Sequence, residues 1–288
     1  MHTKDVTIMI NSTFYDMIGE YYYFIKEIYP ELVKICQKHN INIKYQDVAY
    51  SVKKKSRNNE IILEDLRHID ADRTFFICFR GQQLGWKPNP DDINRLTLGE
   101  YPELVDYIGR VSITELVIMH ALKPFDKRIN DEIKSLPPVK HSLFYLRNGG
   151  YGKYLSDAQK LYYGNDSINN DKEVKDMEIA KAKDLIYEIK NEFDENDDKS
   201  RINIRRYDGI WDDNLNLEEL FIKYTQEYSK LIDTPLDDYI KVHKNYLCED
   251  TQGCFGNFEC ENKSLKEILI EDIINELKLE FPENFGNI

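Results

Sequence analysis

Short apolar segments rich in β-branched residues alternate with longer amphipathic segments along the first third of the chain. Residues 6–10 form the first apolar segment, and residues 41–45 and 74–79 form the next two. Between them, residues 15–39 and 61–69 place apolar side chains three and four positions apart, a spacing typical of helices. A strand, helix, strand, helix, strand order predicts a parallel sheet with helices on both faces.

The second half of the chain repeats this alternation more loosely. We expect strands at residues 141–146 and 201–207, with a charged helix at 172–193 between them. A long loop with short helical turns is expected at residues 80–110, and a helix follows it at 112–122. The fold class that this order predicts is a doubly wound α/β fold with a mostly parallel sheet of about five strands.

Helical patterns dominate the end of the chain, at residues 216–232, 235–246 and 264–281. We therefore expect an α/β domain over residues 1–212 and a C-terminal helical extension over residues 213–288 that packs on it. Pro30 falls inside the first helical pattern and should kink or split that helix, because proline has no amide hydrogen.

Acidic residues outnumber basic ones by 52 to 39, which gives a net charge of −13 and a pI near 5.0. A field of this sign repels phosphate backbones, so we expect neither a nucleic-acid partner nor an anionic membrane partner. No apolar stretch is long enough for a signal peptide or for a bilayer span. The five cysteines, an odd number, fit a reducing compartment. The sequence therefore predicts a cytoplasmic protein.

Three of the cysteines, Cys248, Cys254 and Cys260, follow His243 near the end of the chain. Five residues separate each of these cysteines from the next. Structural zinc ligands typically stand about two to four residues apart, so the spacing favours free thiols over a zinc site. The sequence predicts no metal centre.

Four residues at the turn from the first strand into the first helix are candidates for ligand contact: Ser12, Thr13, Phe14 and Asp16. Ligands of open α/β sheets bind outside the carboxyl ends of the strands, where helix N-termini offer free amides to phosphate. Contact with a phosphate or a ribose is therefore one interpretation. The other is that Thr13 and Asp16 only cap the helix, since no glycine-rich loop accompanies them.

A second group of candidates follows the third strand at the same edge: Arg80, Gly81 and Trp86. Trp86 can stack on a base or a nicotinamide, or it can pin the long loop onto the domain. Arg80 suits a phosphate, although a single arginine at a strand end more often pairs with a nearby carboxylate. Both choices stay open at the level of sequence.

Four ordered segments resemble the TIR-like N-terminal domain of STAND NTPases, a family that includes the telomerase protein component, nephrocystin-3 and the NACHT and WD-repeat proteins. Asn11-Ser-Thr-Phe-Tyr-Asp-Met17 resembles its opening S-S-T-F-x-D-M, and Tyr29-Pro-Glu-Leu32 its F-P-E-L. Arg80-Gly-Gln-Gln-Leu-Gly-Trp86 is similar to its G-x-R-Y-G-W, and Ser112-Ile-Thr-Glu-Leu116 to its S-x-T-E-L. Weaker likenesses continue at residues 141–147 and 207–211.

The resemblance implies a flavodoxin-like or TIR-like sheet and a role as a signalling or effector module. In the wider group of TIR and nucleoside deoxyribosyltransferase folds, some members cleave the N-glycosidic bonds of nucleotides such as NAD. The resemblance therefore implies a nucleotide at the carboxyl edge of the sheet, with NAD as a substrate rather than a cofactor. It also implies self-association, or association with a STAND NTPase in cis or in trans.

Glu115 is the residue on which an enzymatic hypothesis rests, because the resemblance places it where catalytic TIR domains carry an essential glutamate. A carboxylate beside a breaking ribosyl bond stabilises the oxocarbenium charge or orients the ribose hydroxyls. Ser112, at the same helix start, is expected to line the ligand site. Ser112-x-x-Glu115 is also a capping box, in which Glu115 would bond back to the Ser112 amide. Both roles of Glu115 stay open.

The chain departs from the family pattern in two places. Asp47-Val-Ala-Tyr-Ser51 stands where the family has D-L-R-W-G, and no G-x-x-x-x-G-K-[ST] motif occurs. We therefore expect no nucleotide-powered motor in this chain, which makes it a stand-alone version of the domain or a fragment. Two further hypotheses are a non-catalytic assembly domain that positions a partner through its helices, and a nucleoside-processing enzyme of the deoxyribosyltransferase type.

Overall fold

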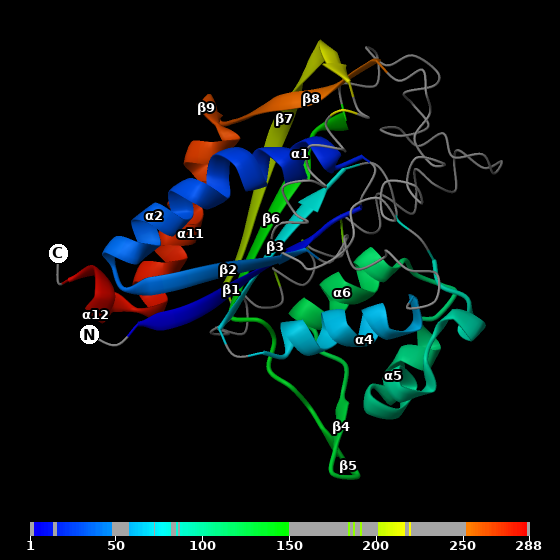
Figure 1. Cartoon of the computed structure of the whole chain (residues 1–288). Helices are drawn as coiled ribbons and strands as arrows, with labels where there is room; N and C mark the ends of the chain where they lie inside the picture. The colour runs from blue at the N-terminus through cyan, green and yellow to red at the C-terminus, as the bar shows by residue number, and fades with distance from the viewer. Residues whose placement is uncertain are drawn as a thin grey trace.

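A seven-stranded sheet forms the centre of the structure, a computed structural model (Figure 1). The structure describes residues 3–13, 16–47, 58–71, 73–81, 85, 87–149, 201–216 and 252–286, together with residues 184, 187, 191 and 219. The strands are β1 (Lys4–Asn11), β2 (Ile41–Asp47), β3 (Thr74–Arg80), β6 (His141–Arg147), β7 (Arg201–Asn216), β8 (Gln252–Cys260) and β9 (Lys263–Ser264).

The strand order is β2-β1-β3-β6-β7-β8-β9. The first five of these strands pair in parallel, and β8 and β9 add antiparallel pairs at one edge. The predicted fold class, a doubly wound and mostly parallel α/β sheet, is confirmed. The sheet has seven strands rather than about five because β8 and β9 extend the parallel set.

Helices cover both faces of the sheet (Figure 1). One face carries α1 (Ile18–Tyr23), the π-helical turn η1 (Phe24–Ile28), α2 (Tyr29–Lys38) and α11 (Leu265–Glu280), and the short α12 (Pro282–Phe285) follows. The other face carries α4 (Asn58–Ile69) and α6 (Ile113–Leu122), with η2 (Pro90–Asp92), α5 (Arg95–Glu100) and η3 (Pro102–Asp106) beside them. The hairpin of β4 (Lys127–Ile129) and β5 (Glu132–Lys134) projects from this layer.

Strand β3 shows how one segment serves two cores. All seven of its residues are buried. Because side chains alternate along a strand, Phe75 and Phe79 join the core under α1, α2 and α11, whereas Phe76 and Cys78 join the core under α4 and α6. This burial on both faces explains why the segment reads as a continuous apolar run.

Pro30 follows an interruption of the regular α-helical bonding in the first helical segment, which nevertheless stays continuous. The α-helical bonding of α1 changes at Phe24 to the wider π-helical turn η1, and α2 begins at Tyr29 with Pro30 in its first turn. The proline ring removes one amide donor, and the wider turn before it accommodates the missing bond. The chain therefore continues in nearly one direction from Ile18 to Lys38 instead of breaking.

The end of the chain differs from the expected helical extension. Helix α11 is present as predicted, with Ser264 as its N-cap, but β7 runs on to Asn216, and β8 and β9 pair beside it. Gly256 and Asn257 are poor strand formers, so the sequence pattern did not predict β8. The buried side chain of Phe255 stabilises this strand in the sheet. The β4–β5 hairpin was also not predicted. The helices predicted at residues 216–232 and 235–246 fall almost wholly outside the described residues.

Three positions within the helix predicted at residues 172–193, namely 184, 187 and 191, are described, and all three are helical. No helix in the described ranges combines the length and apolar character needed to cross a bilayer.

Helix α11 is anchored to the sheet by acidic residues on its buried side. Asp272 receives hydrogen bonds from Arg205 Nη2 at 2.7 Å and from the Tyr145 hydroxyl at 2.8 Å. One turn later, Glu276 Oε2 lies 2.7 Å from His141 Nδ1. These contacts join the C-terminal helix to β6 and β7, so the end of the chain belongs to the same folded unit as the sheet.

Replacing Asp272 with alanine should strongly destabilise the protein. The change leaves the buried Tyr145 hydroxyl without its acceptor and removes one of the two carboxylate partners of Arg205, which keeps Glu261. Leaving a buried group unsatisfied costs about 2 kcal/mol. Urea unfolding of the purified variant measures this loss. Lys263→Ala, which removes an exposed pair with Glu271, is the control and should change the stability by less than about 0.5 kcal/mol. Equal losses in the two variants would contradict the anchoring role.

Candidate functional site

The connections leave β1 and β3 on opposite faces of the sheet. β2 pairs with one side of β1 and β3 with the other. The chain after β1 forms α1 and α2 on one face, and the chain after β3 reaches α6 on the other (Figure 1). In open α/β sheets, such a topological switch point opens a crevice at the carboxyl ends of the two strands. β1 ends at Asn11 and β3 at Arg80, so the predicted ligand residues Ser12, Arg80 and Gly81 lie at this point.

Three segments that are distant in sequence meet around Gly85 on the α6 side of this edge. A Cβ atom at Gly85 would lie 2.9 Å from Thr114 Oγ1, 3.3 Å from Thr13 Cγ2 and 3.5 Å from Ser112 Cβ. The φ angle of Gly85 is +88°, which side chains also disfavour. The Asn11 amide nitrogen donates to the Thr114 carbonyl at 3.1 Å. The structure therefore brings the predicted residues Thr13 and Ser112 together.

Glu115 forms the capping box of α6. Its Oε2 accepts from the Ser112 amide at 2.7 Å and from the Ser112 hydroxyl at 2.8 Å, and its own amide donates to Ser112 Oγ at 3.2 Å. Ser112 is fully buried, and Glu115 is half-buried at the edge of the sheet. The capping role that the spacing predicted is thus present, and it uses one of the two carboxylate oxygens.

The residues after β1 bond to one another instead of capping α1. The Ser12 hydroxyl donates to the Thr13 carbonyl at 3.1 Å, and the Thr13 hydroxyl donates to Asp16 Oδ1. Helix α1 has Met17 as its N-cap and no side-chain cap. The interpretation of Thr13 and Asp16 as a simple helix cap is therefore wrong, because Asp16 is held by other contacts.

Asp16 belongs to a buried cluster around Arg147, the last residue of β6. Arg147 Nη1 donates to the Asp16 carbonyl and to Glu20 Oε1, each at 2.7 Å, and Nη2 lies 3.4 Å from Asp16 Oδ2. The Tyr207 hydroxyl donates to the same Glu20 oxygen at 2.7 Å. All four side chains are at most 1% exposed. The cluster therefore joins the β1–α1 turn to β6 and β7.

Burial dominates the titration of this cluster. It raises the pKa of Glu20, although the Arg147 charge and the Tyr207 hydrogen bond act against the rise. Burial also raises the pKa of Tyr207 well above its ordinary value, and the neighbouring Glu20 carboxyl adds to the rise. Burial therefore makes the protonated form of Glu20 more favourable than it is for an exposed glutamate, and the neighbouring Asp16 charge acts in the same direction.

Phe255 of β8 covers the cluster from the far end of the chain. Its ring centroid lies 4.6 Å from Arg147 Cζ, a cation–π contact. A Cβ at Gly19 would lie 2.3 Å from the Phe255 carbonyl oxygen, so α1 packs directly on β8. The predicted ligand residue Gly81 sits on the other side of the cluster, where a Cβ would lie 2.2 Å from Asp16 Oδ2 and 2.8 Å from Arg147 Nη2. Only glycine fits at position 81.

Arg80 is the other arginine at this edge, and its environment differs. Its side chain is fully buried, and Nε, Nη1 and Nη2 have no hydrogen-bond partner among the described residues. The predicted pairing with a nearby carboxylate is therefore absent in the described part of the chain. Burial raises the pKa of the Cys78 thiol to about 12, and the Arg80 charge acts against this rise. Arg80 thus lies on the α4–α6 side, near Cys78.

Sequence reasoning missed Glu20, Arg147 and Asn11. Glu20 lies on the apolar side of the first helix, between Met17 and Phe24, and Arg147 ends an otherwise apolar strand. A charge on an apolar face at each of these places was a usable signal for a buried pair. The predicted ligand residues Phe14 and Trp86 lie outside the described residues. So does Cys248, whereas Cys260 is buried and its thiol donates to the Arg206 carbonyl at 3.3 Å.

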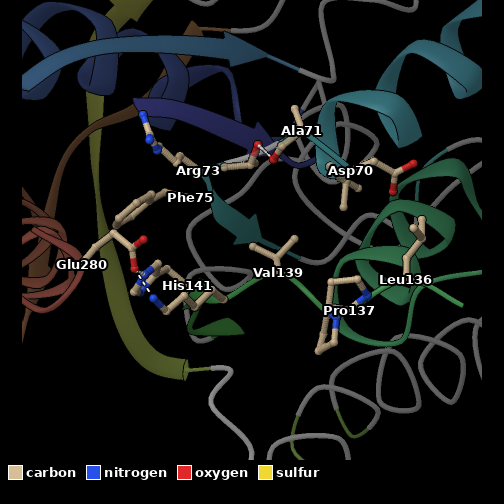
Figure 2. A pocket seen from close by; sticks show the side chains of 13 residues that line it. Asp70, Ala71, Arg73, Phe75, Leu136, Pro137, Val139, His141 and Glu280 are labelled. Atoms are coloured by element: carbon tan, nitrogen blue, oxygen red, sulfur yellow. Dashed lines mark hydrogen bonds and ion pairs between the residues drawn. The ribbon is translucent and has the colours of Figure 1, made fainter. Parts of the chain in front are cut away.

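A separate cavity of about 200 Å³ lies at the opposite edge of the sheet, beside the amino ends of β3 and β6 (Figure 2). His141 stacks on Phe75 with 4.5 Å between ring centroids, and its Nε2 lies 3.1 Å from Glu280 Oε2. Leu136 and Pro137 stand across the cavity from these side chains (Figure 2). Its lining comes from the edge far from the switch point, so it is distinct from the predicted site.

An aspartate–histidine pair beside this cavity is structural. His120 Nε2 lies 2.8 Å from Asp70 Oδ1, and His120 Nδ1 accepts from the Phe125 amide at 3.0 Å. Both imidazole nitrogens are therefore occupied, and His120 cannot act as a general base. Asp70 also accepts from the Tyr101 hydroxyl at 2.5 Å and from Lys127 Nζ at 2.6 Å. The network fixes α4, α6 and the β4–β5 hairpin relative to one another.

Comparison with known protein families, with curated proteins and with solved structures finds no match to this chain.

Gly81→Ala should destabilise the protein by about 1–3 kcal/mol, because the added methyl group collides with the Asp16 carboxylate and the Arg147 guanidinium. The matched control is Gly99→Ala in helix α5. A Cβ there meets nothing within 4 Å, so the change should leave stability unchanged or raise it by up to about 1 kcal/mol. Thermal and urea unfolding compare the two variants. A Gly81→Ala protein as stable as Gly99→Ala would refute the close packing at this edge.

Acid should remove the stability that the Asp70 charge contributes. Burial alone would raise the pKa of Asp70, but the hydrogen bonds from His120, Lys127 and Tyr101 lower it below its ordinary value of 3.8. The contribution is therefore complete above pH 3.8 and is lost as the pH falls through the folded-state value. The difference in unfolding free energy between wild type and Asp70→Asn should shrink from about pH 6 to about pH 3. A difference that grows on acidification would contradict this sign.

Proposed function

We propose that the chain is a cytoplasmic TIR-like signalling module that binds a nucleotide at the carboxyl edge of its sheet. The observation that carries this proposal is the topological switch point between β1 and β3. Ligands of open α/β sheets bind at this place because the diverging connections leave a crevice there. Three residues singled out from sequence lie around it, namely Thr13, Arg80 and Ser112.

The chemistry of the edge supports a ligand with polar and anionic groups. Gly85 is exposed and places no side chain beside Thr13 and Thr114. The N-terminus of α6 lies at the same edge, and helix N-termini favour anions. Arg80 adds a buried positive charge at the end of β3. A nucleotide combines the phosphate and ribose groups that such a site would hold, and we propose NAD as the candidate ligand.

Hydrolysis of the N-glycosidic bond is the finer part of the proposal, and it rests on Glu115. The capping box engages Oε2, so in a cleavage mechanism Oε1 would face the ribose and stabilise its oxocarbenium charge. The same capping box favours a second candidate function. A glutamate that serves only as a helix cap fits a non-catalytic domain that binds a nucleotide and assembles with itself or with a STAND NTPase.

Release of nicotinamide from NAD by the purified protein separates the two functions. The assay uses high protein concentration, with and without a crowding agent that promotes self-association. A hydrolase should release nicotinamide, and Glu115→Gln should lower the rate by at least about 100-fold because the charge that stabilises the transition state is lost. Glutamine keeps an oxygen that can accept from the Ser112 amide, so stability should change little.

The chain contains a matched control in a second capping box. Glu267 bonds to the Ser264 amide at 3.0 Å and to the Ser264 hydroxyl at 2.8 Å, at the start of α11. Glu267→Ala should lower stability but leave nicotinamide release unchanged, whereas Glu115→Ala should lower stability by about 1 kcal/mol and abolish release. If NAD binds but neither the wild type nor any variant releases nicotinamide, the result favours the non-catalytic assembly function. If no nucleotide binds, both functions fail.

A further inference from the structure

Arg80 and Arg147 end neighbouring strands at the same edge of the sheet, yet the chain treats them differently. Arg147 is paired with Asp16 and Glu20. Arg80 is equally buried, but all three of its guanidinium nitrogens have no hydrogen-bond partner in the described ranges. No carboxylate of the described residues forms an ion pair with this guanidinium, so Arg80 carries a buried charge without a direct partner there.

Such an arrangement is costly unless something else supplies the missing charge. An arginine keeps its charge inside a protein, because it does not lose its proton under ordinary conditions. Burying an unpaired charge is strongly unfavourable, and buried polar groups without partners are rare in folded proteins. An anionic ligand that binds at Arg80 would remove this cost, and the site is therefore prepared for a negative charge.

A second buried polar group without a partner among the described residues lies on the same side of the adjacent strand β1. Asn11 pairs with Cys78 in the parallel register of β1 and β3, and its amide nitrogen lies 4.0 Å from Cys78 Sγ. The side chain of Asn11 therefore faces the α4–α6 side, as Cys78 and Arg80 do. Its nitrogen donates to the Thr114 carbonyl, but its Oδ1 is buried and has no partner among the described residues. The same side of the sheet edge thus offers the Arg80 donors on β3 and, on β1, an acceptor that no described residue engages.

We propose that Arg80 and Asn11 form a phosphate subsite that selects phosphorylated nucleosides over unphosphorylated ones. The guanidinium would donate in a fork to two phosphate oxygens, and Asn11 Oδ1 would accept from a ribose hydroxyl of the same ligand. This inference rests on the proposed function and narrows its substrate class. It separates a nucleotide-binding protein from a nucleoside-binding one, because a neutral nucleoside would leave the Arg80 charge uncompensated.

Two ligand pairs that differ only in a phosphate test the subsite. Titration calorimetry compares nicotinamide mononucleotide with nicotinamide riboside, and AMP with adenosine. Wild type should bind the phosphorylated member of a pair at least about 30-fold more tightly. Arg80→Met should remove this preference, and Arg80→Lys should keep a weakened preference because lysine retains the charge but not the fork. Arg95→Met, which removes an exposed arginine of α5, should bind as wild type does.

Stability without ligand gives an independent readout. If Arg80 awaits an anion, Arg80→Met should have a higher Tm than wild type in phosphate-free buffer, because the unpaired buried charge is gone. Nicotinamide mononucleotide should raise the Tm of wild type and not that of Arg80→Met. A lower Tm for Arg80→Met would show that Arg80 has a structural role and would overturn the proposal.

The remaining outcomes separate this subsite from the proposed function. Equal affinity of wild type for the two members of each pair would overturn the subsite while nucleoside or nucleotide binding stands. Stabilisation by inorganic phosphate without any binding of the mononucleotides would overturn the assignment to nucleotides. No binding of any of these ligands, or of NAD, would overturn both the subsite and the proposed function.

Discussion

A buried ion pair between Arg147 and the two acids of the β1–α1 segment holds the carboxyl edge of the sheet together. Asp16 and Glu20 come from the first helical segment, Arg147 from β6, and the Glu20 oxygen is shared with Tyr207 of β7. Phe255 of β8 closes the cluster. Each member would be costly to bury alone, so the arrangement forms as a unit. Gly81, directly after β3, takes its position from it, because it packs directly on Asp16 and Arg147.

The two faces of this edge have different chemistry. On the α1 face the charges are paired within the chain, and packing between Gly19 and Phe255 leaves no room for a side chain. On the α6 face the strand ends present the Arg80 guanidinium and the Asn11 amide oxygen, neither of which has a hydrogen-bond partner within the described part of the chain. A protein interior tolerates buried polar groups when they are satisfied. The contrast agrees with our proposal that one face stabilises the fold and the other binds the ligand.

The two capping boxes illustrate how far a local motif can be interpreted. Ser112 with Glu115 and Ser264 with Glu267 form the same set of hydrogen bonds at the starts of α6 and α11. The bonds are alike because both depend on backbone geometry over one helical turn. Their surroundings differ, since Ser112 is buried beside the switch point and Ser264 is at the edge of the sheet next to β8. A role in chemistry for Glu115 therefore depends on tertiary position and not on the motif.

The sequence by itself determined the alternation that builds β1, β2, β3, β6, α4, α6 and α11, because hydrophobic period, proline and capping signals act over a few residues. It also placed Thr13, Arg80 and Ser112 at one edge, since parallel strands end together. Only the tertiary structure decided which arginines at this edge are paired with carboxylates. Arg147 bonds to Glu20 across 127 positions of the chain. Phe255, which packs on this pair, belongs to β8, a strand whose residues have a low intrinsic preference for strands. Pairing at that distance depends on the packing of the whole sheet, which no local pattern encodes.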